Sequence, residues 1–117
     1  MSLAIVKILD RIRREGGLRS KDVAQLADVS EMTVSRWVNG HRLPEARTQN
    51  ELASLRYVVD RLAEIYSPVQ VRSWLISQDL IADGKRPIDL VFAGQVEYVL
   101  GLIDQLPDPS TGSSLDD

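Results

Sequence analysis

Cysteine is absent from the 117 residues, and histidine occurs once, at His41. Without cysteine the chain forms neither disulfides nor thiolate metal sites, and a single histidine argues against an imidazole metal centre. A phosphate-cradling glycine-rich loop and a carboxylate pair facing a pocket are also missing from the pattern. We therefore expect a protein that is not an enzyme and that needs no metal or other cofactor.

Long apolar runs are lacking too. None approaches the roughly 20 residues that cross a bilayer, and the N-terminal segment alternates apolar and charged side chains instead of forming the apolar centre of a signal peptide. The chain is therefore expected to be soluble and cytoplasmic, with no membrane partner. Alternating strand patterns are equally scarce, whereas apolar residues recur at helical spacing along most of the sequence, so the predicted fold class is all-α.

Charge is unevenly distributed along the chain. Residues 1–50 carry a net charge of +3 and residues 51–117 a net charge of −6, which together give −3. A basic first half is suited to binding phosphates and an acidic second half is not. Ordinary scatter of charged side chains is the simpler explanation of so small an excess until a motif is considered.

Capping residues, glycines and prolines divide the helical pattern into segments. Gly16-Gly17 and Gly40 are placed to end the first and third helices. A long helix is predicted for roughly residues 46–66, and shorter helices follow Ser67, Pro87 and Gly94. The predicted N-caps are Ser2, Ser20, Ser30 and Ser67.

Two short helices joined by the residues Ala-Asp-Val-Ser at 27–30 make a helix-turn-helix candidate. The helices of this motif cross steeply, so their closest approach needs a small side chain, and Ala24 occupies that position. Asp28 then falls at the turn, where glycine is common and where aspartate tolerates the left-handed conformation better than most residues. Apolar residues occur where the two helices bury against each other: Val23, Ala27, Val29, Val34 and Trp37.

The second helix of the pair is left with a polar face. In DNA-binding proteins such a face enters the major groove, where its N-terminal residues reach base edges and the helix dipole favours phosphate. Arg36 and Asn39 are suited to bases or phosphate, and Glu31 either accepts from cytosine or repels phosphate. The alternative is a helical pair without DNA contact. The candidate DNA-binding residues are Ser30, Glu31, Thr33, Ser35, Arg36, Asn39, His41 and Arg42.

Two segments resemble known families. SEMTVSRWVNGHRLP, residues 30–44, resembles the Xre family of phage-repressor-like DNA-binding domains, in which a similar Thr-Val-Ser-Arg-Trp helix is followed by Gly and Pro. Residues 71–106 look like the toxin-binding domain of the Xre/MbcA/ParS antitoxins, through Trp74-Leu75, Gly84, the Pro-Ile-Asp-Leu at 87–90 and the VEYVLGLID helix. The resemblance covers about residues 18–106, and its second half is the more discriminating.

The resemblance implies an N-terminal helix-turn-helix bundle over residues 1–45 and a helical toxin-binding and oligomerisation domain over 46–106. Residues 107–117, with two prolines, small polar residues and three aspartates, are expected to form a disordered acidic tail. It also implies a RES-domain toxin as partner, with an ADP-ribosyltransferase-like fold that consumes NAD or modifies a host protein. Such antitoxins block the toxin's active site and commonly repress the shared promoter, so operator DNA, a homodimer and a hetero-oligomer with the toxin are implied too. The candidate toxin-binding residues are Trp74, Lys85, Arg86, Tyr98 and Asp104.

Several alternatives stay open from the sequence. Trp74 is either an interface anchor or a core residue of the C-terminal helices. Relatives often end in a short tail containing glycine and aromatics, whereas this acidic tail either mimics the phosphates of NAD or is simply solvated. In function, the alternatives to an antitoxin are a stand-alone helix-turn-helix repressor whose C-terminal half dimerises or senses a ligand, and a small adaptor whose helix-turn-helix only scaffolds.

Overall fold

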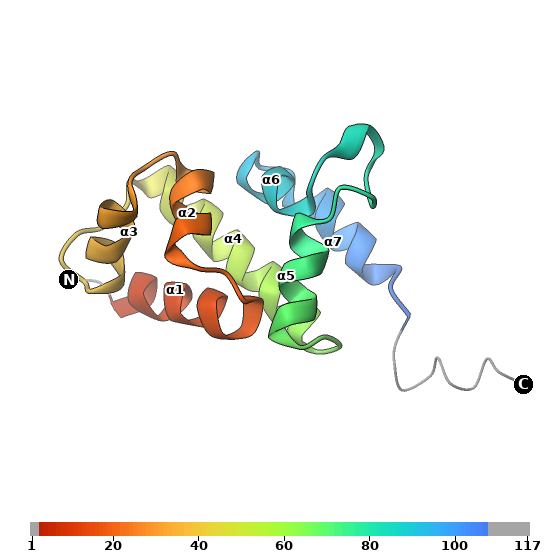
Figure 1. Ribbon diagram of the computed structural model, residues 1–117, viewed down its shortest axis with the longest axis horizontal. Coiled ribbons are helices and arrows are strands. Elements are labelled where there is room, and N and C mark those ends of the chain that lie inside the picture. The colour runs from red at the N-terminus through yellow and green to blue at the C-terminus, as the bar shows by residue number, and fades with distance from the viewer. Residues whose placement is uncertain (1–2, 108–117) are drawn as a thin grey trace, which may run out of the picture.

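The computed structural model describes residues 3–107, which form seven α-helices and one short 3₁₀ helix (Figure 1). No strand occurs in that part of the chain, and the all-α prediction is confirmed. The elements are α1 (Leu3–Gly16), α2 (Ser20–Ala27), α3 (Glu31–Val38), α4 (Ala46–Ala63), α5 (Pro68–Ile76), η1 (Ala82–Gly84), α6 (Pro87–Phe92) and α7 (Val96–Asp104).

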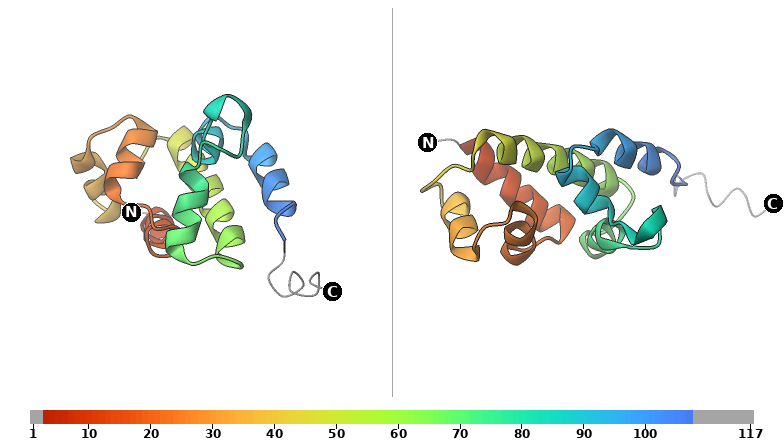
Figure 2. Two further views of the ribbon diagram at one scale, coloured as in Figure 1. Left: turned by 45° about the vertical axis from the view of Figure 1, so that its right-hand side comes forward. Right: turned by 90° about the horizontal axis from the view of Figure 1, so that it is seen from above.

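The long helix α4 contacts helices from both halves of the chain. α1 packs along it, and α5, α6 and α7 also contact it. α2 and α3 pack against each other at one end of the molecule, while α6 and α7 lie toward the other (Figures 1 and 2). The fold therefore connects the helix-turn-helix pair and the C-terminal helices through α1 and α4, and α2 also contacts α6 directly.

The apolar stripe of α4 lies at the centre of the core. Leu52, Leu55 and Leu62 are completely buried, and the buried cluster around them includes side chains from all seven helices. Where α1 meets α4, an added Cβ at Gly16 would lie 3.0 Å from Cγ2 of Val59, so the two helices approach closely there. Burial of these apolar side chains is the main force that holds the two halves together.

The predicted caps are confirmed at three helix ends. Ser30 Oγ accepts the backbone N–H of Thr33 at 3.1 Å at the start of α3. Ser67 and Gln70 form a capping box at the start of α5. Gly40 follows α3 with a left-handed φ of 75°, as expected of a residue that stops a helix.

Two predicted boundaries are wrong. Ser20 is the first residue of α2 and not its cap, because Arg19 holds the N-cap position and its N–H is satisfied by the carboxylate of Asp22 at 2.8 Å. α4 ends at Ala63, short of Tyr66, since the chain turns at residues 64–66 before the next cap. The predicted Ser2 cap lies outside the described residues, as does the predicted acidic tail beyond Pro107.

The predicted division into residues 1–45 and 46–106 stays a prediction. In the part of the chain that the structure describes, no helix is both long and apolar enough to cross a membrane. Within the same residues no three His, Cys, Asp or Glu side chains gather as metal ligands do.

Candidate functional site

The turn between α2 and α3 has the geometry that the sequence predicted. Asp28 adopts the left-handed conformation, with φ 58° and ψ 49°, and the N–H of Val29 donates to the carbonyl of Ala24 at 3.0 Å. Ala24 is buried, in agreement with its predicted place at the closest approach of the two helices. The aspartate thus forms the sharp turn that glycine forms in many helix-turn-helix proteins.

Helix α3 is held on the fold by its inner face. Val34 and Trp37 are buried, so the prediction that Trp37 belongs to the core is confirmed. The hydroxyls of Ser30 and Thr33 lie 3.0 Å apart at the N-terminus of the helix. Because Ser30 Oγ already accepts the Thr33 N–H, the serine's first role is to cap α3 rather than to reach DNA.

The outer face of α3 is exposed and polar, as the spacing predicted. Glu31, Ser35, Arg36 and Asn39 are all exposed. Asn39 Nδ2 donates to Ser35 Oγ at 3.4 Å, and no carboxylate within residues 3–107 forms an ion pair with Arg36. The guanidinium of Arg36 is therefore available to a phosphate or to the edge of a guanine.

Met32 is a member of this face that the sequence did not identify. Its side chain is 65% exposed and its Sδ lies 3.7 Å from Nη2 of Arg36. An exposed apolar side chain on such a helix can contact the methyl group of thymine. The sequence signal that could have identified Met32 is its position one helical turn before Arg36, which places both residues on the same face of α3.

The loop that leaves α3 continues this surface. His41 and Arg42 are exposed, and so is the apolar Leu43. Arg42 and Thr33 line a hollow of about 350 Å³ between α3 and this loop. Thr33 is half-buried there, so this candidate lies at the margin of the exposed face rather than at its centre.

Trp74 belongs to the core. Its side chain is only 8% exposed and its indole N–H has no partner among the described residues. Of the two roles considered from the sequence, core packing is the one this burial supports. The prediction that its ring contacts a partner is not retained, because too little of the ring faces solvent.

Arg86 is braced by its own helix. Its Nε and Nη2 donate to the two carboxylate oxygens of Asp89 at 2.8 and 2.9 Å, which is a bidentate pair at the start of α6. The hydrogen bond to Asp89 raises the pKa of Arg86 above its ordinary value. Lys85, beside it, is exposed and has no ion pair within the described residues.

On α7, Tyr98 is half exposed and Asp104 forms an ion pair with Arg61 of α4 at 2.5 Å. The hydrogen bond to Asp104, followed by that to Tyr57, raises the pKa of Arg61. Tyr57 is half exposed and was not a candidate from the sequence, although its place one helical turn before Arg61 follows from the predicted helix over residues 46–66. Between residues 3 and 107 no hydrogen bond joins Lys85, Tyr98 and Asp104 to one another.

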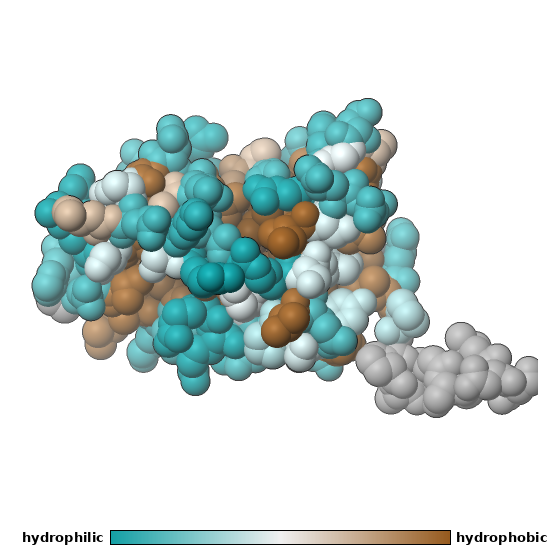
Figure 3. All heavy atoms as spheres, viewed as in Figure 1, coloured by the Kyte–Doolittle hydropathy of each residue, from teal (hydrophilic) through white to brown (hydrophobic). Residues whose placement is uncertain are grey.

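Exposed apolar side chains are scattered over the molecule. On the face shown in Figure 3 the apolar residues form small spots separated by hydrophilic ones. A large apolar patch would by itself indicate a protein interface. The face in Figure 3 carries no large apolar patch. The candidate binding surfaces described above consist of polar and aromatic side chains instead.

A family model matches part of this chain, and a solved structure matches most of it. The family model of bacterial regulatory proteins of the lacI family matches residues 21–53, which contain α2, α3 and the first part of α4. The crystal structure of the Mycobacterium tuberculosis MbcT–MbcA toxin–antitoxin complex contains a chain with 32% sequence identity and a TM-score of 0.74, and the match covers 89% of this chain and 93% of that one.

Two sequence relatives each match 79% of this chain. The mycobacterial cidal antitoxin MbcA of Mycobacterium tuberculosis H37Rv is 34% identical over 92 residues, which is 79% of this chain and 81% of the relative. The probable mycobacterial cidal antitoxin Rv3188 of the same strain is 33% identical over 92 residues, or 79% and 78% of the two chains. At this identity and coverage, with the all-α fold and the helix-turn-helix described above, the chain belongs to the MbcA family of antitoxins.

Proposed function

We propose that this protein neutralises a toxin of the RES-domain class by binding to it and covering its active site. The observation that carries the proposal is the match to a chain of a toxin–antitoxin complex over 93% of that chain and 89% of this one, together with the sequence match to the antitoxin MbcA. A toxin that consumes NAD or modifies a host protein is harmful while its active site is open. A protein that blocks the site needs no catalytic group of its own.

The C-terminal helices supply the surface for this partner. Tyr98 offers an exposed aromatic ring, and Lys85 an exposed charge, next to the braced Arg86–Asp89 pair. Aromatic and arginine side chains are the residue types that most often contribute strongly to protein interfaces. Asp104 is held by Arg61, so its contribution is to fix the surface of α7 against α4.

The test is co-expression with the product of the neighbouring gene. Expressed alone, that product should arrest growth; expressed with this protein, it should form a stable complex that restores growth. Tyr98→Ala should weaken the complex by about tenfold or more if the ring is a strong contact. Leu3→Ala, which removes most of another highly exposed apolar side chain but on α1, outside the C-terminal helices, is the control. Unarrested growth and the absence of a complex would refute the proposal.

We also propose that α3 binds operator DNA and that the protein represses its own promoter. The exposed face of Glu31, Ser35, Arg36 and Asn39 on a well-capped helix supports this, as does the match of residues 21–53 to a family of bacterial regulators. Two copies bound to two half-sites are the usual arrangement for such helices, so a homodimer is part of the proposal. Arg36→Ala should lower affinity for the upstream DNA and reduce its preference over a scrambled duplex.

A further inference from the structure

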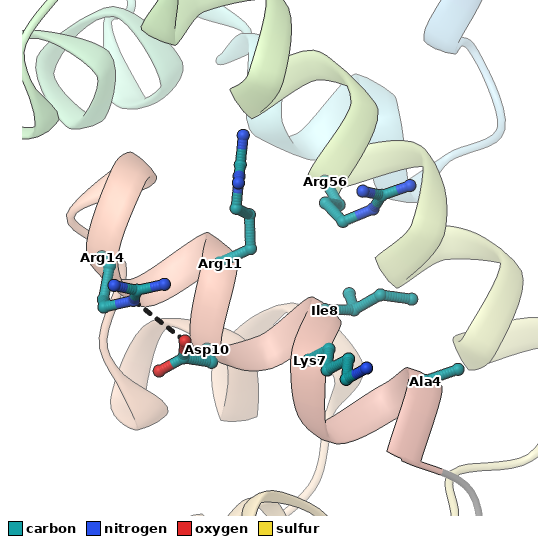
Figure 4. A pocket seen from close by; sticks show the side chains of 7 residues that line it. All are labelled: Ala4, Lys7, Ile8, Asp10, Arg11, Arg14 and Arg56. Carbon is teal, nitrogen blue, oxygen red and sulfur yellow. Dashed lines mark hydrogen bonds and ion pairs between the residues drawn. The ribbon is translucent and has the colours of Figure 1, made fainter.

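A hollow of about 410 Å³ lies between α1 and α4, and no residue of α3 lines it (Figure 4). Its polar lining is mainly cationic: Lys7, Arg11 and Arg14 come from α1 and Arg56 comes from α4, with Asp10 as the only carboxylate. Nothing in the proposed roles of α3 or of the C-terminal helices uses these residues. The concentration of guanidinium groups around an open hollow therefore calls for its own explanation.

The ion pairs of this surface leave positive charge uncompensated. Asp10 is shared by Arg13 and Arg14 at 3.0 and 2.9 Å, and Asp60 is shared by Arg11 and Arg56 at 2.8 and 3.4 Å. Lys7 has no ion pair within the described residues. We call the five cations the α1 basic surface: Lys7, Arg11, Arg13, Arg14 and Arg56.

The four cations of α1 outnumber its carboxylates, Asp10 and Glu15, by two. From the second half of the chain the fold adds one charge of each sign, Arg56 and Asp60. Elsewhere in the described chain, four pairs each match one cation to one carboxylate: Arg47–Glu51, Arg61–Asp104, Arg72–Asp22 and Arg86–Asp89. The α1 basic surface therefore keeps an excess of two positive charges.

The α1 basic surface adjoins the helix-turn-helix. A smaller hollow of about 110 Å³ lies on the other side of Asp10 and is lined by Arg13 of α1, by Arg19 at the start of α2, and by Val34 and Val38 of α3. α1 also contacts α3 directly. The cations consequently begin beside α3 and continue along α1 as far as the hollow of Figure 4.

The dimensions of DNA determine which part of the duplex α1 contacts when α3 lies in the major groove. A helix with its side chains is about 10–12 Å across and fills the major groove, which is about 12 Å wide. Elements that flank the inserted helix therefore face the phosphate backbones at the groove's edges. Arginine forks match phosphate oxygens in a bidentate manner, and at 64% and 60% side-chain exposure Arg13 and Arg14 are open to such a contact.

We propose that the α1 basic surface binds the phosphate backbone of DNA beside the bases that α3 contacts. The inference rests on the proposed binding of DNA by α3 and extends its footprint to a helix outside the helix-turn-helix. Phosphate contacts set the position and strength of binding without reading sequence, whereas the outer face of α3 carries the sequence preference. The same protein therefore divides affinity and specificity between two surfaces.

The experiment measures the salt dependence of DNA binding. Fluorescence anisotropy follows the full-length protein on a labelled duplex from the DNA upstream of its own gene, and on a scrambled duplex of equal composition, over a series of salt concentrations. The double variant Lys7→Gln/Arg14→Gln should reduce the slope of log affinity against log salt by about 2, one for each lost phosphate contact, on both duplexes. The ratio of affinities for the two duplexes should stay within about twofold of wild type.

The matched control is Lys85→Gln/Arg61→Gln, which removes two positive charges away from α1 and α3 and should leave the slope unchanged. Circular dichroism confirms that both double variants are folded. An unchanged slope in Lys7→Gln/Arg14→Gln would overturn the inference. So would the finding that the α1 basic surface binds an acidic protein and not DNA. If wild type binds both duplexes equally but the slope falls, operator recognition by α3 fails and the phosphate-binding surface stands.

Discussion

The carboxylate of Asp22 is shared between two distant parts of the chain. It accepts the backbone N–H of Arg19 at the start of α2, and it forms a bidentate pair with Arg72 of α5, with Nη1 at 2.5 Å and Nη2 at 3.1 Å. Burial raises the pKa of Asp22, but the hydrogen bonds and charges of Arg72 and Arg19 outweigh it, and the pKa lies below its ordinary value. One side chain thus caps α2 and joins it to the second half.

The lowered pKa of Asp22 makes stability depend on pH. Because the folded pKa is depressed, the stabilisation is fully present above about pH 4, the ordinary pKa of aspartate, and is lost as pH falls through the folded value. Asp22→Asn should lower the free energy of unfolding by about 1–3 kcal/mol at pH 7, and the difference from wild type should shrink as pH falls below about 4. Urea unfolding at pH 7 and at a series of pH values below about 4 measures this. Asp83→Asn, an exposed aspartate with no ion pair in the described chain, should show no such change.

Gly17 is required by its backbone and by its neighbour. Its φ is +65°, and a Cβ there would lie 2.8 Å from the carbonyl oxygen of Pro68, which is backbone and cannot move cheaply. Gly17→Ala should therefore destabilise the fold by about 2–4 kcal/mol. Gly101→Ala is the contrasting variant, since its Cβ meets nothing within 4 Å on an exposed turn of α7 and alanine favours helix by about 0.5–1 kcal/mol. Thermal melts that rank the two variants the other way would contradict this account.

At the scale of an element, α3 depends on its first residue. Ser30→Ala removes the acceptor of the Thr33 N–H and should lower the free energy of unfolding by about 1 kcal/mol. Ser35→Ala in the middle of the same helix is the control: Ser35 is exposed and alanine is the better helix former, so stability should be equal or higher. Denaturant titrations of both variants decide it, and equal losses would mean that Ser30 acts by something other than capping.

The helices and their faces could be predicted from the sequence because the signals for them are local. Serine caps, prolines and glycines located the helices, and the 3.6-residue period identified both the inner and the outer face of α3. The start of α2 was misplaced by one residue because the cap bond comes from Asp22, inside the helix, and not from Ser20. The exposure of Met32 and the burial of Trp74 depend on how helices pack, which periodicity alone does not determine.

Contacts between distant residues were beyond the sequence. Arg72 and Asp22 are 50 positions apart, and Arg11 and Asp60 are 49 apart, so nothing local indicates that they pair. The positive charge of the first half was visible, but its gathering around Arg56 appears only once α1 lies against α4. Local structure could be predicted, whereas the charged surfaces had to await the packing of the helices.

At the scale of the whole molecule, a single buried cluster extends from α1 to α7. We predict that residues 3–107 unfold in one cooperative transition. The two tryptophans report on α3 and α5, one in each half of the chain: Trp37→Phe leaves only Trp74, and Trp74→Phe leaves only Trp37. In each variant, fluorescence of the remaining indole and far-UV circular dichroism should give the same urea midpoint. Separate midpoints for the two signals would mean that the predicted segments 1–45 and 46–106 fold independently.

The close contact of α1 with α4 also affects how proteins of this family evolve by recombination between related genes. A recombination event that joins the first 45 residues of one gene to the remainder of another would pair Gly16 with a foreign neighbour in place of Val59. Most such chimaeras would be poorly packed and removed by selection. We therefore expect the two halves of the chain to be inherited together. New DNA preferences would arise by point substitutions on the outer face of α3, where side chains change without disturbing the ancestral core.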